Sequence, residues 1–134
     1  MRRAAVQAVT YDPTAIVQRQ LDAYNAHDVE ALMAIDSDDV QHFEFPSTLV
    51  ASGAAQVRER LSVRFQAPEL HARLVNRIAM GNLVIDQEVI TRNFPEPDAG
   101  SQIGTIELIA MYEVQGERIV RAWFRFGQKL LGRP

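Results

Sequence analysis

The sequence predicts an α+β domain in which a cone-shaped, curved and mainly antiparallel sheet is packed on three N-terminal helices. Apolar residues follow helical spacing in the first half of the chain, whereas the second half consists of long runs rich in Val and Ile. The expected order is helix, helix, strand, helix and then four strands, which indicates an α+β domain and not a parallel βαβ array. At 134 residues the chain is expected to be one domain, 1–134, that buries roughly 70% of its unfolded surface.

Three helices are expected in the first half of the chain. The first begins after Asp12, because a capping side chain followed by proline is typical of a helix start. Asp28 is a good N-cap for a second helix after a break at 25–27, and 53–66 is expected to form the third. Residues 1–12 are expected to be extended or disordered. The apolar positions at helical spacing are Ile16, Val17, Leu21 and Tyr24 in the first helix and Val57, Leu61 and Phe65 in the third.

Five strands are expected around and after the third helix. Residues 40–45 alternate between two faces and stop at a proline. Later breaks are a Gly-Asn turn, a proline-containing loop at 95–101 and a Gln-Gly-Glu hairpin turn. The four strands that these breaks define are 70–80, 83–94, 104–114 and 118–126. A long meander of this kind, folded over three helices, makes a cone.

The composition argues against several classes of function. A formal net charge of −3 does not suit nucleic acid, which needs a concentrated basic surface. Arg58, Arg60 and Arg64 form a basic run, but Glu59 interrupts it, so a solvated helix face is expected there. Without cysteine there is no disulfide and no thiolate nucleophile or metal ligand. No run of 18 apolar residues exists and the start of the chain does not resemble a signal peptide, so a cytoplasmic protein without membrane contact is expected.

Several acidic and basic side chains fall within apolar strands. By the two-residue period of a strand, His42 and Glu44 share one face, and Asp86 and Glu88 share another with apolar neighbours. Carboxylates in such places either lie on a wet face or lie in a pocket that raises their pKa. Both readings stay open for Asp86, Glu88 and Glu107. On a wet face the cross-strand partners would be Arg73, Arg77 or Arg121.

The segment from Tyr24 to Pro46 carries a family resemblance. It reads as the end of one helix, a short second helix, an acidic loop, and a strand with a carboxylate before a proline. This order resembles the opening of SnoaL-like and ketosteroid-isomerase-like enzymes of the nuclear-transport-factor-two-like superfamily. The resemblance implies a cone built around one pocket, which unrelated functions share. In ketosteroid isomerases a carboxylate at the position of Glu44 is the proton-transferring base; here Phe45 is one extra residue before the proline.

The resemblance does not imply steroid isomerisation. The isomerases use a tyrosine on the first helix and a protonated aspartate on a late strand as oxyanion donors, and those positions hold Gln20 and Leu108 here. What remains resembles SnoaL-like cyclases, dehydratases and hydrolases, which use a carboxylate–histidine constellation without a cofactor. The implied catalytic roles are Glu44 as base, His42 as acid or electrostatic partner and Asp86 as orienting carboxylate, with no cofactor.

The same three side chains could also be read as a metal site, but no local spacing such as HxxxH supports it, and no metal is expected. Aromatic residues on every element suit a pocket for an apolar ligand. Trp123 shares its strand face with Arg121 and Arg125, so that face either lines a polar pocket or forms a dimer surface. A homodimer through the convex sheet face is expected. The residues expected to bind substrate are Tyr24, Glu88, Glu107 and Trp123.

The sequence therefore predicts a small cofactor-independent enzyme that transfers protons on an apolar, oxygenated small molecule. Isomerisation, dehydration, cyclisation and epoxide hydrolysis all remain open. The alternative is a non-catalytic module for small-molecule binding or dimerisation. An enzyme pocket should hold His42 and an inward-facing carboxylate within hydrogen-bond reach, whereas a binding module should hold an apolar pocket with those groups in solvent.

Overall fold

The predicted α+β fold is confirmed by a computed structural model, which describes residues 12–96 and 100–132. Apart from Asp12, the segment expected to be extended or disordered lies outside the described residues. Three helices come before most of the sheet. The elements are α1 (Pro13–Asn25), α2 (Val29–Met33), β1 (Asp36–Glu44), β2 (Thr48–Ser52), α3 (Ala54–Arg64), β3 (His71–Met80), β4 (Leu83–Glu96), β5 (Gly100–Gln115) and β6 (Arg118–Leu131).

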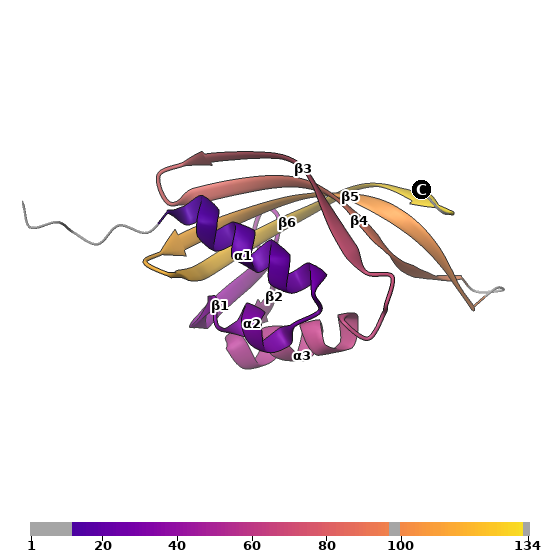
Figure 1. The fold of residues 1–134 in the computed structure, drawn as a ribbon, viewed down its shortest axis with the longest axis horizontal. Coiled ribbons are helices and arrows are strands. Elements are labelled where there is room, and N and C mark those ends of the chain that lie inside the picture. Colours follow the sequence, from indigo (N-terminus) through magenta and orange to yellow (C-terminus); the bar gives the residue numbers. More distant parts are fainter. Residues whose placement is uncertain (1–11, 97–99, 133–134) are drawn as a thin grey trace, which may run out of the picture.

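The described strands form one sheet in the order β2-β1-β6-β5-β4-β3. Every neighbouring pair is antiparallel except β1 and β6, which run parallel, so the sheet is mixed but mostly antiparallel. Figure 1 shows the long strands β3 to β6 arching over α1, with α2 and α3 beyond it on the same side. The concave face of the sheet therefore looks toward the helices, and the convex face looks away from them.

The structure contains one strand that the sequence pattern did not predict. β2 is short and all but one of its residues are exposed, so its apolar residues show no alternation that would mark a face. It pairs with β1 through a tight connection after Glu44. β1 also begins four residues earlier than predicted, because its first residue, Asp36, pairs with Ile119 of β6. The expected acidic loop 37–39 is thus part of a strand, where tertiary pairing overrides local preference.

The turn between the first two helices is tied to β3. Asp12 and Asp28 cap α1 and α2 as predicted, each accepting a backbone N–H at 3.0 Å. The side chain of Asn25 accepts a hydrogen bond from the backbone N–H of Ala72 at 2.8 Å and donates one to the carbonyl oxygen of the same residue at 2.9 Å. His27 donates from Nε2 to the carbonyl oxygen of Leu70 at 2.7 Å and stacks on the ring of Phe65. These contacts fix α1 against the concave face and so form one wall of an internal cavity.

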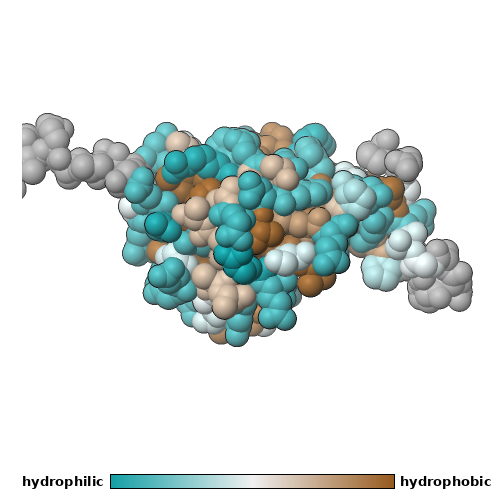
Figure 2. Space-filling view, turned by 60° about the horizontal axis from the view of Figure 1, so that its bottom comes forward, coloured by the Kyte–Doolittle hydropathy of each residue, from teal (hydrophilic) through white to brown (hydrophobic). Residues whose placement is uncertain are grey.

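The core lies between α1 and the concave face of the sheet. Figure 2 views the molecular surface from the side of α2 and α3 and shows hydrophobic residues in its middle with hydrophilic residues around them. None of the helices in the described part is long and apolar enough to cross a membrane. The core side chains that are almost fully buried include Ile16, Val17, Val40, Val57, Val84, Ala110, Ile119 and Ala122.

Candidate active site

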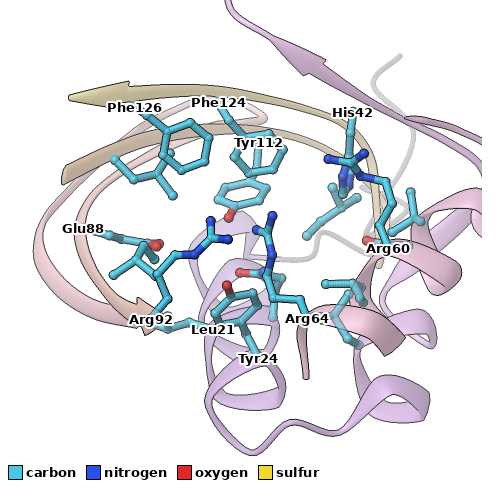
Figure 3. Close-up of a pocket in the computed structure, with 18 residues that line it drawn as sticks. Leu21, Tyr24, His42, Arg60, Arg64, Glu88, Arg92, Tyr112, Phe124 and Phe126 are labelled. Carbon is cyan, nitrogen blue, oxygen red and sulfur yellow. The ribbon is translucent and has the colours of Figure 1, made fainter. Parts of the chain in front are cut away.

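A cavity of about 120 Å³ lies between α1, α3 and the concave face of the sheet. Much of its wall is apolar, with Leu21 from α1, Leu61 from α3 and Phe124 from β6 among its residues. Ionisable and polar side chains enter this apolar wall from every side (Figure 3). They are Gln20, Tyr24, Asp36, His42, Arg60, Arg64, Glu88, Arg92 and Tyr112.

His42 reaches the cavity from β1, on the same strand face as the buried Val40. Its ring packs edge-to-face on Phe124, with ring centroids 5.2 Å apart. Burial lowers the pKa of His42 to about 4, and the positive charges of Arg60 and Arg64 add to this effect. At neutral pH the imidazole is therefore uncharged, and one ring nitrogen is free to accept a proton.

Glu88 reaches the cavity from β4 and is only 4% exposed. Burial raises the pKa of Glu88 to about 8, and the negative charge of Asp86 acts in the same direction. Its Oε2 atom has no hydrogen-bond partner among the described residues. At neutral pH Glu88 is therefore a protonated acid that can donate to a bound molecule.

Asp36 is a second buried acid in the cavity, and the sequence analysis missed it. It is 3% exposed, burial raises its pKa to about 7, and its Oδ2 atom lacks a partner within the described chain. The segment around it looked like an acidic loop. No local period marks it, because Asp38, the residue between Asp36 and Val40 in a two-residue period, is exposed and the pairing of β1 with β6 is irregular between Asp36 and Gln41.

Two tyrosines add hydroxyl groups to the same cavity. Burial raises the pKa of Tyr24, and burial together with the charges of Glu88 and Asp86 raises the pKa of Tyr112 well above its usual range. Both phenols thus stay protonated and can donate hydrogen bonds. Tyr24 is a predicted substrate-binding residue, whereas Tyr112 was not among the predicted site residues. Neither occupies the positions at which a ketosteroid isomerase would carry its oxyanion donors, here Gln20 and Leu108, although both of those residues also line the cavity.

Asp86 faces inward as one reading of β4 predicted, but it does not line the cavity. It is fully buried and accepts two hydrogen bonds from Arg77, from Nε to Oδ1 at 2.6 Å and from Nη2 to Oδ2 at 2.9 Å. Arg77 is its cross-strand partner on β3 and also donates to Gln18 of α1 at 2.8 Å. Asp86 therefore acts on the cavity through its charge on Glu88 and through the position of Arg77.

The structure does not bring Glu44 into the cavity with His42. Glu44 is the last residue of β1 and is exposed. The pairing of β1 with β2 has a bulge between His42 and Phe43, and the chain turns away toward β2 directly after Glu44. The extra residue of this bulge is Val50 of β2, and β1 pairs regularly with β6 from Gln41 to Glu44, so Glu44 keeps the strand face of His42. It lies outside the cavity because it is the exposed last residue of the strand.

Glu107 and Trp123 lie on the convex face, away from the cavity. The Oε1 atom of Glu107 accepts the backbone N–H of Gln128 at 2.9 Å, where the pairing of β5 and β6 is irregular. Trp123 stacks on Phe43 with ring centroids 5.7 Å apart. Of the two readings of the Trp123 face, the polar pocket is therefore not what the structure shows. Of the four residues expected to bind substrate, Tyr24 and Glu88 line the cavity and these two do not.

The basic run on α3 divides between two environments. Arg58 pairs with Glu30 on the surface, as expected for a solvated helix face. Arg60 and Arg64 also line the cavity; Arg60 is exposed as expected, whereas Arg64 is half-buried, so the expectation is wrong for Arg64. Each of them follows a cavity-lining apolar residue by three positions, Val57 and Leu61, and residues three apart share a helix face. That spacing could have placed both arginines at the pocket.

The profile of the SnoaL-like domain family matches residues 17–122 of this chain. The chain belongs to this family. The match begins within α1 and ends within β6, and it includes every residue that lines the cavity except Phe124 and Phe126. The resemblance seen in the sequence from Tyr24 to Pro46 is thereby confirmed.

Solved structures similar to this SnoaL-like domain share its fold at low sequence identity. A cystatin-fold protein of Novosphingobium aromaticivorans is 24% identical with a TM-score of 0.76, over 86% of this chain and 98% of its own. A candidate polyketide cyclase of Xanthomonas campestris is 21% identical with a TM-score of 0.69, over 86% and 90%. IdmH, a candidate polyketide cyclase of Streptomyces antibioticus, is 17% identical with a TM-score of 0.70, over 87% and 92%. No curated protein is similar enough in sequence to be matched.

The cavity of this SnoaL-like domain thus offers acids, a base and hydroxyl donors in an apolar wall. Figure 3 shows His42 and Glu88 on opposite sides of the cavity, so these two groups do not form the direct histidine–carboxylate contact that an enzyme pocket was expected to hold. In the ranges 12–96 and 100–132, no group of three or more His, Asp or Glu side chains is placed to hold a metal ion. A molecule between His42 and Glu88 would meet a proton acceptor on one side and a proton donor on the other.

Proposed function

We propose that this SnoaL-like domain is a cofactor-independent enzyme that transfers protons on a small oxygenated molecule with an apolar body. The observation that carries the proposal is the inverted order of two pKa values in one cavity, about 4 for His42 and about 8 for Glu88. A histidine normally holds its proton to a higher pH than a glutamate does. Environments that push two groups apart in this way are typical of paired catalytic acids and bases.

The inverted order gives each group a role at neutral pH. His42 accepts a proton from a carbon atom next to a carbonyl group, and Glu88 donates its own proton to the carbonyl oxygen, so the product of this step is a neutral enol. In each completing step Glu88 takes back the enol proton and His42 gives up its own. Donation by His42 to a different carbon atom completes an isomerisation, and donation to a departing hydroxyl group completes a dehydration with release of water. In a cyclisation the enol carbon attacks a second carbonyl, and His42 protonates the new alkoxide. Tyr112 supports the same oxygen as a hydroxyl donor.

This assignment keeps His42 in the chemistry but changes its role from acid to base. Glu88 takes the acid role, since burial raises its pKa, and Asp86 is a positioning residue whose charge adds to this effect. The buried Asp36 is a second proton donor or acceptor within the cavity. Two of the similar structures are described as candidate polyketide cyclases, and cyclisation is one of the reactions for which this acid–base pair is suited.

Exchange of ketone protons with solvent tests the proposal with a simple ketone in place of the natural substrate. We expect the protein to accelerate deuterium incorporation next to the carbonyl of small lipophilic ketones such as 2-tetralone, measured by NMR in deuterium oxide. Glu88→Gln and His42→Ala should each lower the exchange rate roughly 100-fold, the usual scale for a general acid or base. A surface variant on the convex face, Glu113→Gln, is the matched control and should exchange like the wild type.

The alternative function, ligand binding without catalysis, predicts a different result. A binding module would retain small molecules in the cavity but would accelerate neither proton exchange nor the turnover of ketones and epoxides. Equal exchange rates in the wild type and in both cavity variants would also remove His42 and Glu88 from the chemistry.

A homodimer through the convex face also remains part of the proposal. This face carries the stacked Trp123 and Phe43 rings and an exposed Ile109, a mixture of aromatic and aliphatic residues that suits a partner surface. Light scattering at micromolar concentration should give twice the mass of the chain, and Trp123→Glu should shift it toward the mass of one chain. A single-chain mass for the wild type would contradict the dimer.

A further inference from the structure

Three arginines stand where the inner cavity meets a second, outer space. Arg60 and Arg64 of α3 and Arg92 of β4 line the cavity, and the same three residues line a cleft of about 460 Å³ between α3 and β4. Figure 3 shows the side chains of Arg64 and Arg92 pointing into the cavity, between His42 and Glu88. The inner cavity is smaller than ordinary ligand sites of roughly 300–1,000 Å³, whereas the outer cleft falls in that range. A ligand of ordinary size would therefore extend from one space into the other, past these arginines.

The positive charge of this group is not neutralised by the side chains around it. The ion pairs in the described part of the chain use Arg58, Arg77 and Arg121. The carboxyl groups among the described residues that line the inner cavity are Asp36 and Glu88, and burial raises the pKa of both toward or above neutrality. The outer cleft adds one acid, Glu59, which is exposed.

Two of the arginines also repel each other. Burial lowers the pKa of Arg92, and the charge of Arg64 lowers it further. The guanidinium of Arg92 lies over the ring of Phe94, 5.1 Å from its centroid, a contact that leaves the charge unneutralised. An anion between Arg64 and Arg92 would offset this repulsion and would accept charge-assisted hydrogen bonds from both guanidinium groups.

We propose that the ligand of this cavity is an organic anion whose carboxylate is held by Arg64 and Arg92, with Arg60 at the opening. Its apolar, oxygenated body lies in the inner cavity, and any longer substituent lies in the outer cleft. The inference deepens the proposed function, because it places the reacting part of the molecule between His42 and Glu88. It concerns charge recognition, however, and it can hold or fail without turnover.

A pair of probes with the same shape and different charge tests this inference. Cinnamate and cinnamamide share an apolar body, and only the former carries a negative charge at neutral pH. We expect calorimetric titration to give at least about tenfold tighter binding of cinnamate, with an affinity that falls as salt is added. Arg64→Gln and Arg92→Gln should each weaken cinnamate binding about tenfold and leave cinnamamide binding within about twofold.

Arg58→Gln is the matched control, since Arg58 is on the same helix as Arg64 but pairs with Glu30 outside both spaces. It should bind cinnamate like the wild type. Thermal unfolding checks that each variant folds; Arg64 is at the end of α3, so its variant keeps the test decisive even if Arg92→Gln does not fold.

Equal affinities for acid and amide, equal losses of both probes in the arginine variants, or no binding of cinnamate at millimolar concentration would each overturn the inference. The outcome is separable from that of the proposed function. Ketone proton exchange that depends on Glu88, with no preference for the acid, would leave the proton-transfer enzyme intact and remove the anion. Cinnamate binding through Arg64 without any ketone proton exchange would leave the anion site intact and remove the proton-transfer enzyme.

Discussion

The two faces of one sheet carry similar residues in opposite states. On the concave face, Asp36 and Glu88 are buried, burial raises their pKa values to about 7 and about 8, and each has one oxygen without a partner among the described residues. On the convex face, Glu113 is paired with Arg121 and Glu107 accepts a backbone N–H. A carboxyl group within an apolar strand therefore indicates a site only when it is both buried and unpartnered. The two-residue period of a strand sorts side chains by face, but it does not say which face is buried.

The ion pairs on the two faces offer the largest expected difference. Arg77→Met would leave Asp86, which is fully buried, without its partner, and we expect it to lower the free energy of unfolding by about 3 kcal/mol. Arg121→Met removes a pair whose arginine side chain is 42% exposed, and we expect a loss below about 1 kcal/mol. Denaturant unfolding of both variants measures the difference. Similar losses would mean that burial does not separate the two faces.

The dependence of stability on pH should also differ between the faces. The pKa of Glu88 is about 8 in the folded protein against an ordinary value of 4.5, so the folded state holds a proton that the unfolded chain releases between these values. Its contribution to stability is therefore lost as the pH rises through about 8. The raised pKa of Asp36 acts in the same direction, with its loss near pH 7. The lowered pKa of His42 acts in the opposite direction but only below its unfolded value of 6.5.

Between about pH 6.5 and 8, Glu88 and Asp36 therefore determine how the free energy of unfolding changes with pH. We expect the free energy of unfolding of the wild type to fall by on the order of 2 kcal/mol over this window. Denaturant unfolding at both ends of the window should show a smaller fall for Glu88→Gln. The convex variant Glu113→Gln should follow the wild type, and a wild-type slope in Glu88→Gln would show that Glu88 is not protonated in the folded state.

Regular local patterns predicted much of the fold. Asp12 and Asp28 cap helices as expected. The alternation of β4 places Asp86 and Glu88 together on a buried face, which is the inward-facing one of the two readings that the sequence left open. The parts that were missed depend on tertiary contacts. β2 is an exposed edge strand, and Asp36 belongs to β1 only because that strand pairs with β6. Such pairings join segments that are far apart in sequence, and no local period reports them.

The candidate site was predictable to a smaller degree than the fold. His42, Tyr24 and Glu88 could be selected because strand and helix periods place them on inward faces. Which of those groups are protonated depends on burial and on neighbouring charges, and these follow from the packing of α3 and β4 around one cavity. The sequence therefore indicated a histidine that lines the cavity, as an acid or electrostatic partner, and a carboxylate, Glu44, that is exposed at the end of β1.

The smallest expected effect concerns that carboxylate. Glu44 is exposed at the end of β1, whereas Glu88 is almost fully buried in the cavity. The same isosteric change, Glu→Gln, can be made at both positions. If position relative to a proline determined the base, as the family resemblance implied, Glu44→Gln would lower ketone proton exchange roughly 100-fold. We expect it to change the rate by less than about twofold, because a solvated side chain outside the cavity contacts no bound molecule and surface changes rarely matter. NMR exchange rates of the two variants, measured with the same ketone, compare them directly, and a large loss in Glu44→Gln alone would return the base to the end of β1.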